Sequence, residues 1–403
     1  MPGVVNLNRI KQEFFGVTSD NCPCIMVGDS DQGTDDRTQF TASDAMVCKH
    51  SAALKGYFED NLVASFLNID VPTPPTNFAQ RRKPPIINRG YFARVHSINT
   101  TIQKFIAAAD AGTMERRQII SLGSGYDTLS LRLLRGKDEN LHIYEVDFEK
   151  IIRKKVGICL NDPVIRELLI PSVENSKDVF REEKNGRGES SVNSRNGVGA
   201  LSMNDSAGNY SFNNLHFLSG DLRNSGHIIE LLLQASLDPT APTLILTECV
   251  MVYIEKSPCM CLCKALSEML SEATWVTYDM ISPTDIFGRT MLRNLTAARF
   301  NIPGFIDFPT LHLQSERFLE CGWDIARSET MLSVYDNHVS LEEKHRISRL
   351  EIFDEIEEWQ MLMSHYSLTV AVKGTLLLDV LPVLTNTAEG MGTDVGTGNT
   401  LKR

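Results

Sequence analysis

The feature that most constrains this chain is a short apolar run that ends in a glycine-rich turn and then becomes helical. The run is Gln118–Leu122, the turn is Gly123-Ser124-Gly125-Tyr126-Asp127, and residues 128–134 continue with helical spacing. Glycines after a first strand let the backbone turn tightly and let a ligand approach without a Cβ in the way. The pattern therefore predicts the beginning of a Rossmann-like α/β sheet.

The same alternation of strand and helix continues along the chain. A second strand pattern over 141–146 ends in Asp147, and residues 148–158 have helical spacing. Later strand candidates are 215–218, 243–247 and 274–278, each followed by a helix-period segment. Strands separated by helices of this length predict a mostly parallel sheet that is covered by helices on both faces.

The segments outside this alternation predict the domain organisation. Residues 1–40 and the tail 386–403 are expected to be flexible, and residues 41–385 are expected to form a single domain that begins with helices over 41–110. Ser, Asn and Gly make up 19 of the 42 residues of 171–212. This composition buries too little apolar surface to offset the entropy of ordering, so 171–212 is predicted to be a disordered insertion. Near the C-terminus, helices are expected at 341–348 and 351–364, before a strand at 365–372.

Composition and charge exclude several classes of protein. The chain has 403 residues, 42% of them apolar, and its 40 Lys+Arg against 51 Asp+Glu give a net charge of −11. These values are typical of a globular protein, and the acidic balance argues against nucleic acid as a partner. No apolar run reaches the roughly 18 residues of a membrane span, and the N-terminus does not resemble a secretory signal. We expect a soluble monomer of the cytoplasm or nucleus, without a membrane or nucleic-acid partner.

The nine cysteines are predicted to be free thiols in a reducing compartment rather than metal ligands. The run Cys259-x-Cys261-x-Cys263 points its thiols around a helix and not toward one point. No second set has the spacing that zinc sites need, so no metal site is expected.

Acidic residues follow the predicted strands at the edge where a parallel sheet binds ligands. Asp147 stands 24 positions after Gly123, where a carboxylate can accept both hydroxyls of a ribose. Thr128 replaces the third glycine of a dinucleotide fingerprint, which favours an adenosine cofactor without phosphates. S-adenosylmethionine is the obvious candidate, although a glycine turn with a later acid also occurs in α/β proteins without such a cofactor.

Two further acids, Asp221 and Glu248, follow the strand candidates at 215–218 and 243–247. Asp221, with the backbone N–H beside it, can read the edge of an adenine, and Glu248 can face the ammonium or sulfonium charge of the cofactor. Either acid alone could instead cap the following helix. Three acids at one edge of the sheet favour a cofactor site over separate helix caps.

Four segments carry a resemblance to a known family. They are Asn88-Arg89-Gly90-Tyr91-Phe92-Ala93-Arg94-Val95-His96, Leu122–Thr128, Tyr144-Glu145-Val146-Asp147-Phe148 and Glu248-Cys249-Val250-Met251-Val252-Tyr253. From about Asp44 to Lys373, apart from 171–212, the chain resembles the leucine carboxyl methyltransferases, which methylate the C-terminal leucine of type 2A protein phosphatase catalytic subunits. Residues 89–94 are the most specific piece, because many methyltransferases share the glycine turn.

The resemblance implies a class I S-adenosylmethionine-dependent methyltransferase fold with a mostly parallel, seven-stranded sheet. It also implies a lid formed by the N-terminal helices, C-terminal helical additions and a phosphatase catalytic subunit as partner. Carried over by position, the cofactor contacts fall on Lys49, Arg94, Gly123, Asp147, Asp221, Leu222 and Glu248. Arg94 would grip the carboxylate of the cofactor's methionine part. The family pattern is interrupted by the 171–212 insertion, which leaves the loops on the substrate side open.

The implied reaction needs no general base. An α-carboxylate has a pKa of about 3.5 and is ionised at pH 7, so catalysis must come from alignment and from exclusion of water. A buried substrate carboxylate needs a cation or hydrogen-bond donors. Arg89, Arg94 and Lys49 are the candidate catalytic cations, and the sequence does not choose among them. Tyr253 either lines the leucine pocket or is an ordinary packed aromatic residue.

Three alternatives to this function remain. They are a tRNA-modifying carboxyl methyltransferase of the same family, a small-molecule carboxyl methyltransferase, and a non-catalytic cofactor-binding regulator of the phosphatase. The tRNA-modifying relatives carry an additional C-terminal propeller, whereas this chain ends 30 residues after Lys373. The acidic balance also disfavours tRNA. The presence of Gly123, Asp147, Asp221 and Glu248 argues against a chain without activity.

Overall fold

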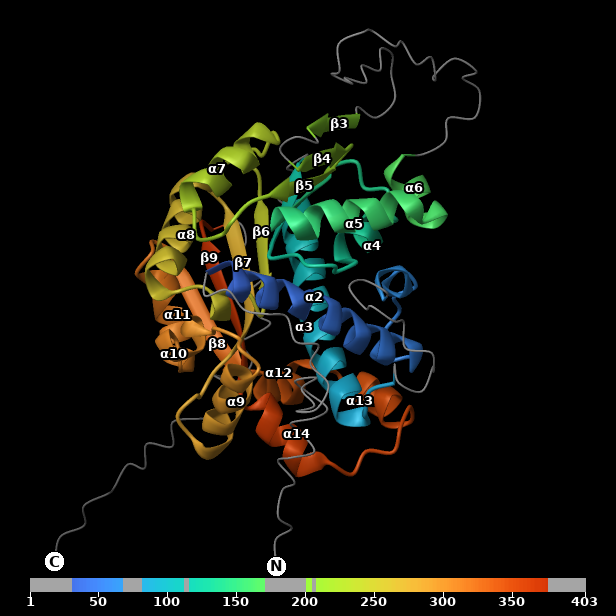
Figure 1. The fold of residues 1–403 in the computed structure, drawn as a ribbon, viewed down its shortest axis with the longest axis vertical. Coiled ribbons are helices and arrows are strands. Elements are labelled where there is room, and N and C mark those ends of the chain that lie inside the picture. The colour runs from blue at the N-terminus through green and yellow to red at the C-terminus, as the bar shows by residue number, and fades with distance from the viewer. Residues whose placement is uncertain (1–30, 68–81, 112–115, 171–200, 205–207, 376–403) are drawn as a thin grey trace, which may run out of the picture.

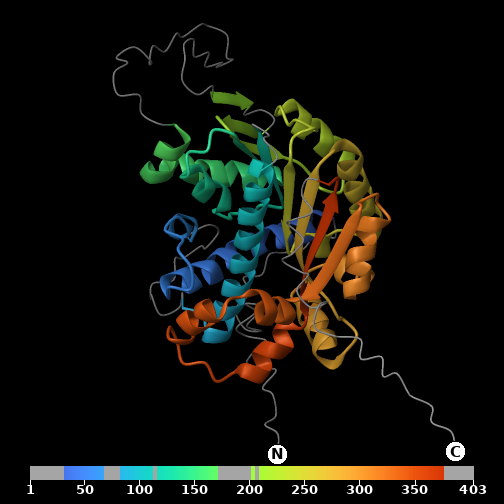
Figure 2. The ribbon, with the colours of Figure 1, turned by 180° about the vertical axis from the view of Figure 1, so that it is seen from behind.

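The fold is a sheet between two layers of helices (Figures 1 and 2). It is described by a computed structural model over residues 31–67, 82–111, 116–170, 201–204 and 208–375. The expectations for residues 1–30, 171–200 and 386–403 lie outside these described residues. Within them, no helix is both long enough and apolar enough to cross a membrane.

The sheet has nine strands in the order β3-β4-β5-β2-β1-β6-β7-β9-β8 within the described residues. The strands are β1 (Arg117–Leu122), β2 (Leu141–Asp147), β3 (Leu201–Asn204), β4 (Asn209–Phe212), β5 (Leu215–Ser219), β6 (Thr243–Glu248), β7 (Ala273–Met280), β8 (Ile325–Thr330) and β9 (Tyr366–Lys373). Strands β5, β2, β1, β6 and β7 are parallel, and β9 is inserted antiparallel between β7 and β8. The chain reverses its direction of winding between β1 and β6, which is the switch point where such sheets bind ligands.

The helices connect these strands and cover both faces of the sheet. They are α2 (Asp31–Leu54), α3 (Pro85–Ala111), α4 (Leu129–Leu134), α5 (Glu149–Asn161), α6 (Pro163–Leu169), α7 (Ser225–Gln234), α8 (Lys256–Met269), α9 (Ile286–Ala297), α10 (Pro303–Asp307), α11 (Leu311–Leu319), α12 (Met331–His338), α13 (Leu341–Ser348) and α14 (Ile356–Met363). In Figure 1, α7, α8 and α11 lie on one side of the sheet, and α3, α4 and α5 lie on the other. Helices α12, α13 and α14 gather at the lower end of α3 (Figure 2).

Successive apolar side chains of each central strand pack on opposite faces of the sheet, which produces two separate hydrophobic cores. Ile119 and Ile143 point to the core shared with α3 and α5, whereas Ile120 and Tyr144 point to the core shared with α7 and α8. Successive side chains of a strand face opposite sides, so a parallel strand buried on both faces carries apolar residues at nearly every position. This is why the strand patterns were recognisable as short continuous apolar runs.

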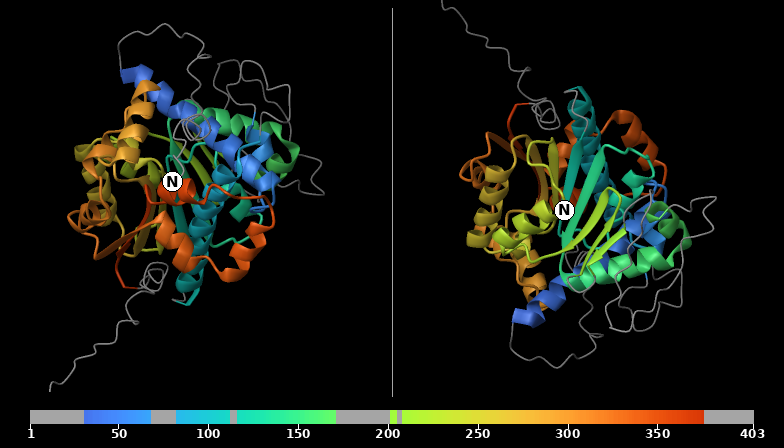
Figure 3. Two further views of the ribbon diagram at one scale, coloured as in Figure 1. Left: turned by 90° about the horizontal axis from the view of Figure 1, so that it is seen from below. Right: turned by 90° about the horizontal axis from the view of Figure 1, so that it is seen from above.

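The register of the parallel strands brings their carboxyl ends to one level. Leu122 pairs with Val146, Asp147 pairs with Ser219, and Glu248 pairs with Tyr278. The glycine turn therefore begins level with the ends of β2, β5, β6 and β7. Helix α2 lies across this edge of the sheet, at the level where the strands end (Figures 1 and 3).

Three expectations are corrected by the described residues. The seven-stranded sheet is present as the strands from β5 to β8, but β3 and β4 add two antiparallel strands at the β5 edge. The prediction of disorder for 171–212 is therefore wrong for 201–204 and 209–212. Helix α2 begins at Asp31, so the flexible segment predicted over 1–40 is wrong for its last ten residues.

The second correction has a simple cause. Low apolar content averaged over 42 residues hides a short alternating segment, in which Tyr210 and Phe212 are both buried. The ring of Phe212 meets the ring of Phe217 edge to face, with 6.1 Å between their centroids. Two aromatic rings buried against β5 are enough to order a four-residue strand at this edge.

We predict that Phe212→Ala lowers the free energy of unfolding by about 3 kcal/mol, because a buried phenyl ring leaves a cavity. Denaturant unfolding monitored by circular dichroism measures the change. The control is Ile352→Ala, which removes a side chain that is 91% exposed and should cost less than about 0.5 kcal/mol. Equal stability of the Phe212 variant and the parent would show that β4 does not pack on the sheet.

Candidate functional site

The glycine turn after β1 has a backbone that only glycine adopts easily. Gly123 has φ +65° and Gly125 has φ +51°, both in the left-handed region. A Cβ on Gly123 would come within 2.6 Å of a Val250 methyl group, and one on Gly125 would come within 3.2 Å of Ala42 of α2. The turn is thus confined between the loop after β6 and the covering helix, and the Ser124 hydroxyl in it is buried without a hydrogen-bond partner.

Asp147 closes this turn from the end of β2. Its carboxylate accepts hydrogen bonds from the backbone N–H groups of Gly125 and Phe148, each at 2.7 Å. Burial raises the pKa of Asp147 to about 6, although both N–H groups and the nearby Lys155 lower it. The group is therefore ionised at pH 7 and takes up a proton in mildly acidic solution.

A buried charge network joins α2 to the same turn. Lys49 Nζ lies 2.7 Å from Asp127 Oδ2 and 3.9 Å from Asp60 Oδ2, and the Lys49 side chain is only 4% exposed. Arg132 approaches Asp60 from the other side at 3.6 Å. Burial raises the pKa of Asp127, but Lys49 and Arg132 outweigh this effect and hold the pKa well below its usual range. Two cations and two carboxylates thus compensate each other under the helix.

Arg94 of α3 reaches the end of β6. Its Nε donates to Glu248 Oε2 at 2.7 Å, and Nη2 donates to the Glu248 carbonyl at 3.4 Å. The guanidinium lies 5.6 Å from the ring centre of Tyr91 and 4.9 Å from that of Tyr278. These contacts use only part of the five N–H donors of a guanidinium, so Arg94 can hold a further anion.

Four tyrosines surround this arginine. Tyr278 stacks on Tyr366 with 5.1 Å between ring centres, and Tyr253 interacts with both Arg94 and Thr41 of α2. Burial raises the pKa values of Tyr91, Tyr253, Tyr278 and Tyr366. Their hydroxyls therefore remain protonated and available as hydrogen-bond donors near neutral pH.

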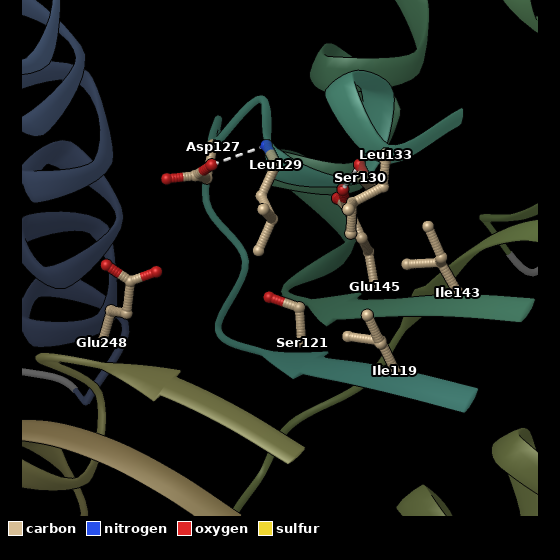
Figure 4. A pocket seen from close by; sticks show the side chains of 9 residues that line it. All are labelled: Ile119, Ser121, Asp127, Leu129, Ser130, Leu133, Ile143, Glu145 and Glu248. Carbon is tan, nitrogen blue, oxygen red and sulfur yellow. Dashed lines mark hydrogen bonds between the residues drawn. The ribbon is translucent and has the colours of Figure 1, made fainter. Parts of the chain in front are cut away.

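A small pocket, with room for about one water molecule, lies between the turn, β1, β2 and α4 (Figure 4). Asp127 and Glu248 lie on one side of it, and Ile119, Ile143 and Leu133 lie on the other. Behind it, Glu145 accepts a hydrogen bond from Ser130 and pairs with Lys155 at 2.5 Å. The pocket therefore has an apolar wall, a neutralised polar base and a charged rim.

The predicted adenine-side residues lie at the end of the neighbouring strand β5. The backbone N–H of Gly220 donates to the Asp147 carbonyl at 2.9 Å, which brings the Asp221 loop against the Asp147 loop. Leu222 is buried in the core shared with α7. Asp221 is held by Arg223, which also pairs with Asp35 of α2.

The structure brings together most of the residues singled out from the sequence. Lys49, Arg94, Gly123, Asp147, Asp221, Leu222, Glu248 and Tyr253 all lie along the edge where the parallel strands end. Arg89 does not join them, because its guanidinium sits 4.0 Å from the ring centre of Phe353, beside α14. Arg94 stands five positions after Arg89 on the helix, a rotation of about 140° that turns the two side chains to different flanks of α3.

Several polar side chains at this edge were not singled out from the sequence. Asp127 and Tyr91 stand inside the recognised motifs, and Arg223 follows Asp221 by two positions, so their place in those motifs was the available signal. Tyr278 and Tyr366 carried no local signal, because only the pairing of β7 with β9 brings them to Arg94.

The site offers no activated base or nucleophile among the described residues. His96 packs against Phe92, 5.2 Å between ring centres, and burial lowers its pKa. Its charged neighbours are Glu343 and Arg346, so His96 and Arg94 face different sides of α3. Burial raises the pKa of the Cys249 thiol to about 12. Over the same residues, no group of three His, Cys, Asp or Glu side chains could hold a metal ion.

The donor set fits an adenosine cofactor with a charged methionine tail. Three kinds of group lie together at the switch point of a Rossmann-like sheet: a carboxylate bonded to the glycine turn, acids at the ends of two further strands, and a cation beside them. Fold and site together define a class I S-adenosylmethionine-dependent methyltransferase.

Comparison with known proteins identifies the family within this class of methyltransferases. Residues 37–267 match the family model for leucine carboxyl methyltransferase, and the chain belongs to this family. It is 32% identical to a leucine carboxyl methyltransferase 1 homolog of Arabidopsis thaliana, over 84% of this chain and 90% of that protein. It is 31% identical to leucine carboxyl methyltransferase 1 of Yarrowia lipolytica, over 81% and 94%. A tRNA wybutosine-synthesizing protein 4 of Rattus norvegicus is 29% identical over 84% of this chain, but over only 44% of its own length.

We predict that Lys49→Met destabilises the fold by about 3 kcal/mol, because Asp127 and Asp60 then face each other without their shared cation. Thermal and denaturant unfolding measure the loss. Lys55→Met is the matched control: this lysine of the same stretch is one-third exposed, pairs with Glu351 at 3.2 Å, and should cost no more than about 1 kcal/mol. Equal effects of the two substitutions would contradict a structural role for the Lys49 network.

Proposed function

We propose that this enzyme transfers the methyl group of S-adenosylmethionine to the α-carboxylate of the C-terminal leucine of a type 2A protein phosphatase catalytic subunit. The observation that supports this most strongly is the pairing of Arg94 with Glu248 among four tyrosines, beside the glycine turn of a leucine carboxyl methyltransferase chain. This arrangement supplies hydrogen-bond donors for a carboxylate, and a carboxylate that is already ionised needs no general base to accept a methyl group.

The cofactor roles follow from the positions of the side chains. Asp147 would accept the ribose hydroxyls, and the cofactor would lie against the glycine turn at Gly123. Asp221 and the N–H of Leu222 would bind the adenine edge. Lys49 and Arg94 would hold the carboxylate of the methionine part, and Glu248 would face its ammonium group.

The bound cofactor supplies an electrophilic methyl group on a sulfonium. The protein's part is to hold the substrate carboxylate in line with that methyl at about 3 Å and to exclude water. The carboxylate oxygen would replace sulfur on the methyl carbon without any transfer of a proton, so the protein's residues would only have to position the carboxylate. Hydroxyl donors such as that of Tyr253 can orient the carboxylate without adding a charge.

The substrate assignment is tested with radiolabelled S-adenosylmethionine and phosphatase catalytic subunit, with and without its terminal leucine. We expect label on the intact subunit and none on the truncated one. Transfer RNA and free leucine serve as further arms, because a tRNA wybutosine-synthesizing protein is among the relatives. Label on tRNA but not on the phosphatase would replace the proposed substrate. Binding of cofactor without transfer to any of them would favour a regulatory protein.

The proposed enzyme is a monomer that meets the phosphatase in the cytoplasm. Sedimentation of the active enzyme at assay concentration, with activity proportional to concentration, tests this point. Activity confined to a dimeric fraction would contradict it.

We predict that Asp147→Ala lowers affinity for S-adenosylhomocysteine at least tenfold, since each charge-assisted hydrogen bond contributes about 1.5–3 kcal/mol. Because the pKa of Asp147 is about 6, affinity of the parent should be constant above pH 7 and fall as the pH drops below 6. The variant should lack this fall. Calorimetry that finds unchanged affinity in the folded variant would remove Asp147 from the site.

We predict opposite outcomes for two neighbouring residues of α3. Arg94→Ala should lower kcat/KM by about 10- to 1000-fold through lost positioning, whereas His96→Gln should stay within about threefold of the parent. The parent's rate should be flat from about pH 6.5 to 8.5, because the substrate needs no deprotonation. Single-turnover kinetics provide the measurement. A loss of about 100-fold in the His96 variant would establish a general base and overturn the mechanism.

A further inference from the structure

Arg223 joins two carboxylates that come from distant parts of the chain. Its Nε and Nη2 donate to Asp221, at 3.0 Å and 2.7 Å, and its Nη1 and Nη2 donate to Asp35 of α2, at 3.2 Å and 2.8 Å. One planar guanidinium thus presents a bidentate edge to each acid. The backbone N–H of Arg223 also donates to Asp221 at 2.9 Å, which fixes the turn after β5.

The position of this guanidinium links the cover of the site to its adenine end. Its carbon lies 6.0 Å from the ring centre of Phe148, the residue after the proposed ribose acid Asp147. Asp35 is the fifth residue of α2, and the same helix meets the glycine turn through Ala42 and Lys49. Arg223 therefore connects the first part of α2 to the loop that carries Asp221.

We propose that Arg223 is a positioning residue that clasps α2 over the adenine end of the bound cofactor and sets the orientation of the Asp221 carboxylate. The proposal rests on the proposed function, because it takes Asp221 as the adenine-side acid. The clasp acts on release: the cofactor leaves only when α2 moves away from the β5 edge, and that movement breaks the contact between Arg223 and Asp35.

The strength of the clasp is moderate and depends on salt. The side chains of Arg223, Asp221 and Asp35 are 40%, 39% and 26% exposed, so water and ions weaken their attraction. Two bidentate edges offset part of this weakness, and a lysine would keep the charge but lose the fork. A charge effect and a geometric effect can therefore be separated by substitution.

The test measures the dissociation rate of S-adenosylhomocysteine from the full-length protein by stopped-flow displacement. This ligand lacks the sulfonium charge of S-adenosylmethionine, which removes one electrostatic contribution to the rate. We expect Asp35→Asn and Arg223→Gln each to raise the rate about five- to tenfold, and Arg223→Lys to fall between Arg223→Gln and the parent. Glu268→Gln, which removes one exposed acid paired with Lys264 on α8, is the matched control and should change nothing.

Two readouts distinguish a clasp from a general loss of stability. In the Arg223→Gln background, Asp35→Asn should add no further change, because the contact is already lost. Raising NaCl from about 50 mM to about 500 mM should speed release from the parent and leave the Asp35 variant nearly unchanged. The melting temperatures should stay within a few degrees of each other.

The proposal is overturned if Asp35→Asn releases the ligand at the parent's rate, or if its effect is the same with and without Arg223. Failure of the clasp is distinguishable from failure of the site. If the parent binds S-adenosylhomocysteine and the variants release it normally, the site stands and the clasp falls. If the parent does not bind it at all, the proposed cofactor site itself is wrong.

Discussion

The site depends on the register of the parallel strands. Leu122 beside Val146, Asp147 beside Ser219 and Glu248 beside Tyr278 bring the ends of five strands to one row. A one-residue slip in any strand would turn its last side chain to the other face and remove it from the edge. The glycine turn, both neighbouring acids and the aromatic wall are therefore consequences of backbone pairing more than of contacts among themselves.

Most buried ions at this edge have a partner of opposite charge, whereas Asp147 accepts hydrogen bonds from two backbone N–H groups. Lys49 compensates Asp127, Arg94 compensates Glu248, and Lys155 compensates Glu145 below the pocket. Unpaired ions at these depths would be strongly destabilising. Lys49 and Arg94, the two cations of the proposed mechanism, are thus held in place by carboxylates of the folded protein.

Much of this could be predicted from the sequence, and the rest could not for identifiable reasons. The glycine turn, Asp147 and Glu248 were predicted because strand and turn chemistry is local. The motif alone could not show which of Arg89 and Arg94 faces the site, because both stand in one helix. The structure decides this, since the helix turns the two side chains to different flanks. Strands β3 and β4 were missed because composition was averaged over a long polar segment. The tyrosines on β7 and β9 needed the antiparallel insertion of β9, which no local pattern predicts.

The covering helix α2 is the first described element of the chain, yet its contacts reach far along it. Lys49 meets Asp127 78 residues later, and Asp35 meets Arg223 188 residues later. Arg94 of the next helix, α3, pairs with Glu248, which stands 154 residues later in the sequence. Contacts between residues so far apart in the sequence form slowly, because the chain loses the entropy of closing a long loop before the contact stabilises it. Asp35 and Arg94 can meet their partners only after the segment that contains β5 and β6 has been added to the chain, so the covering of this edge by α2 and α3 is completed late in folding.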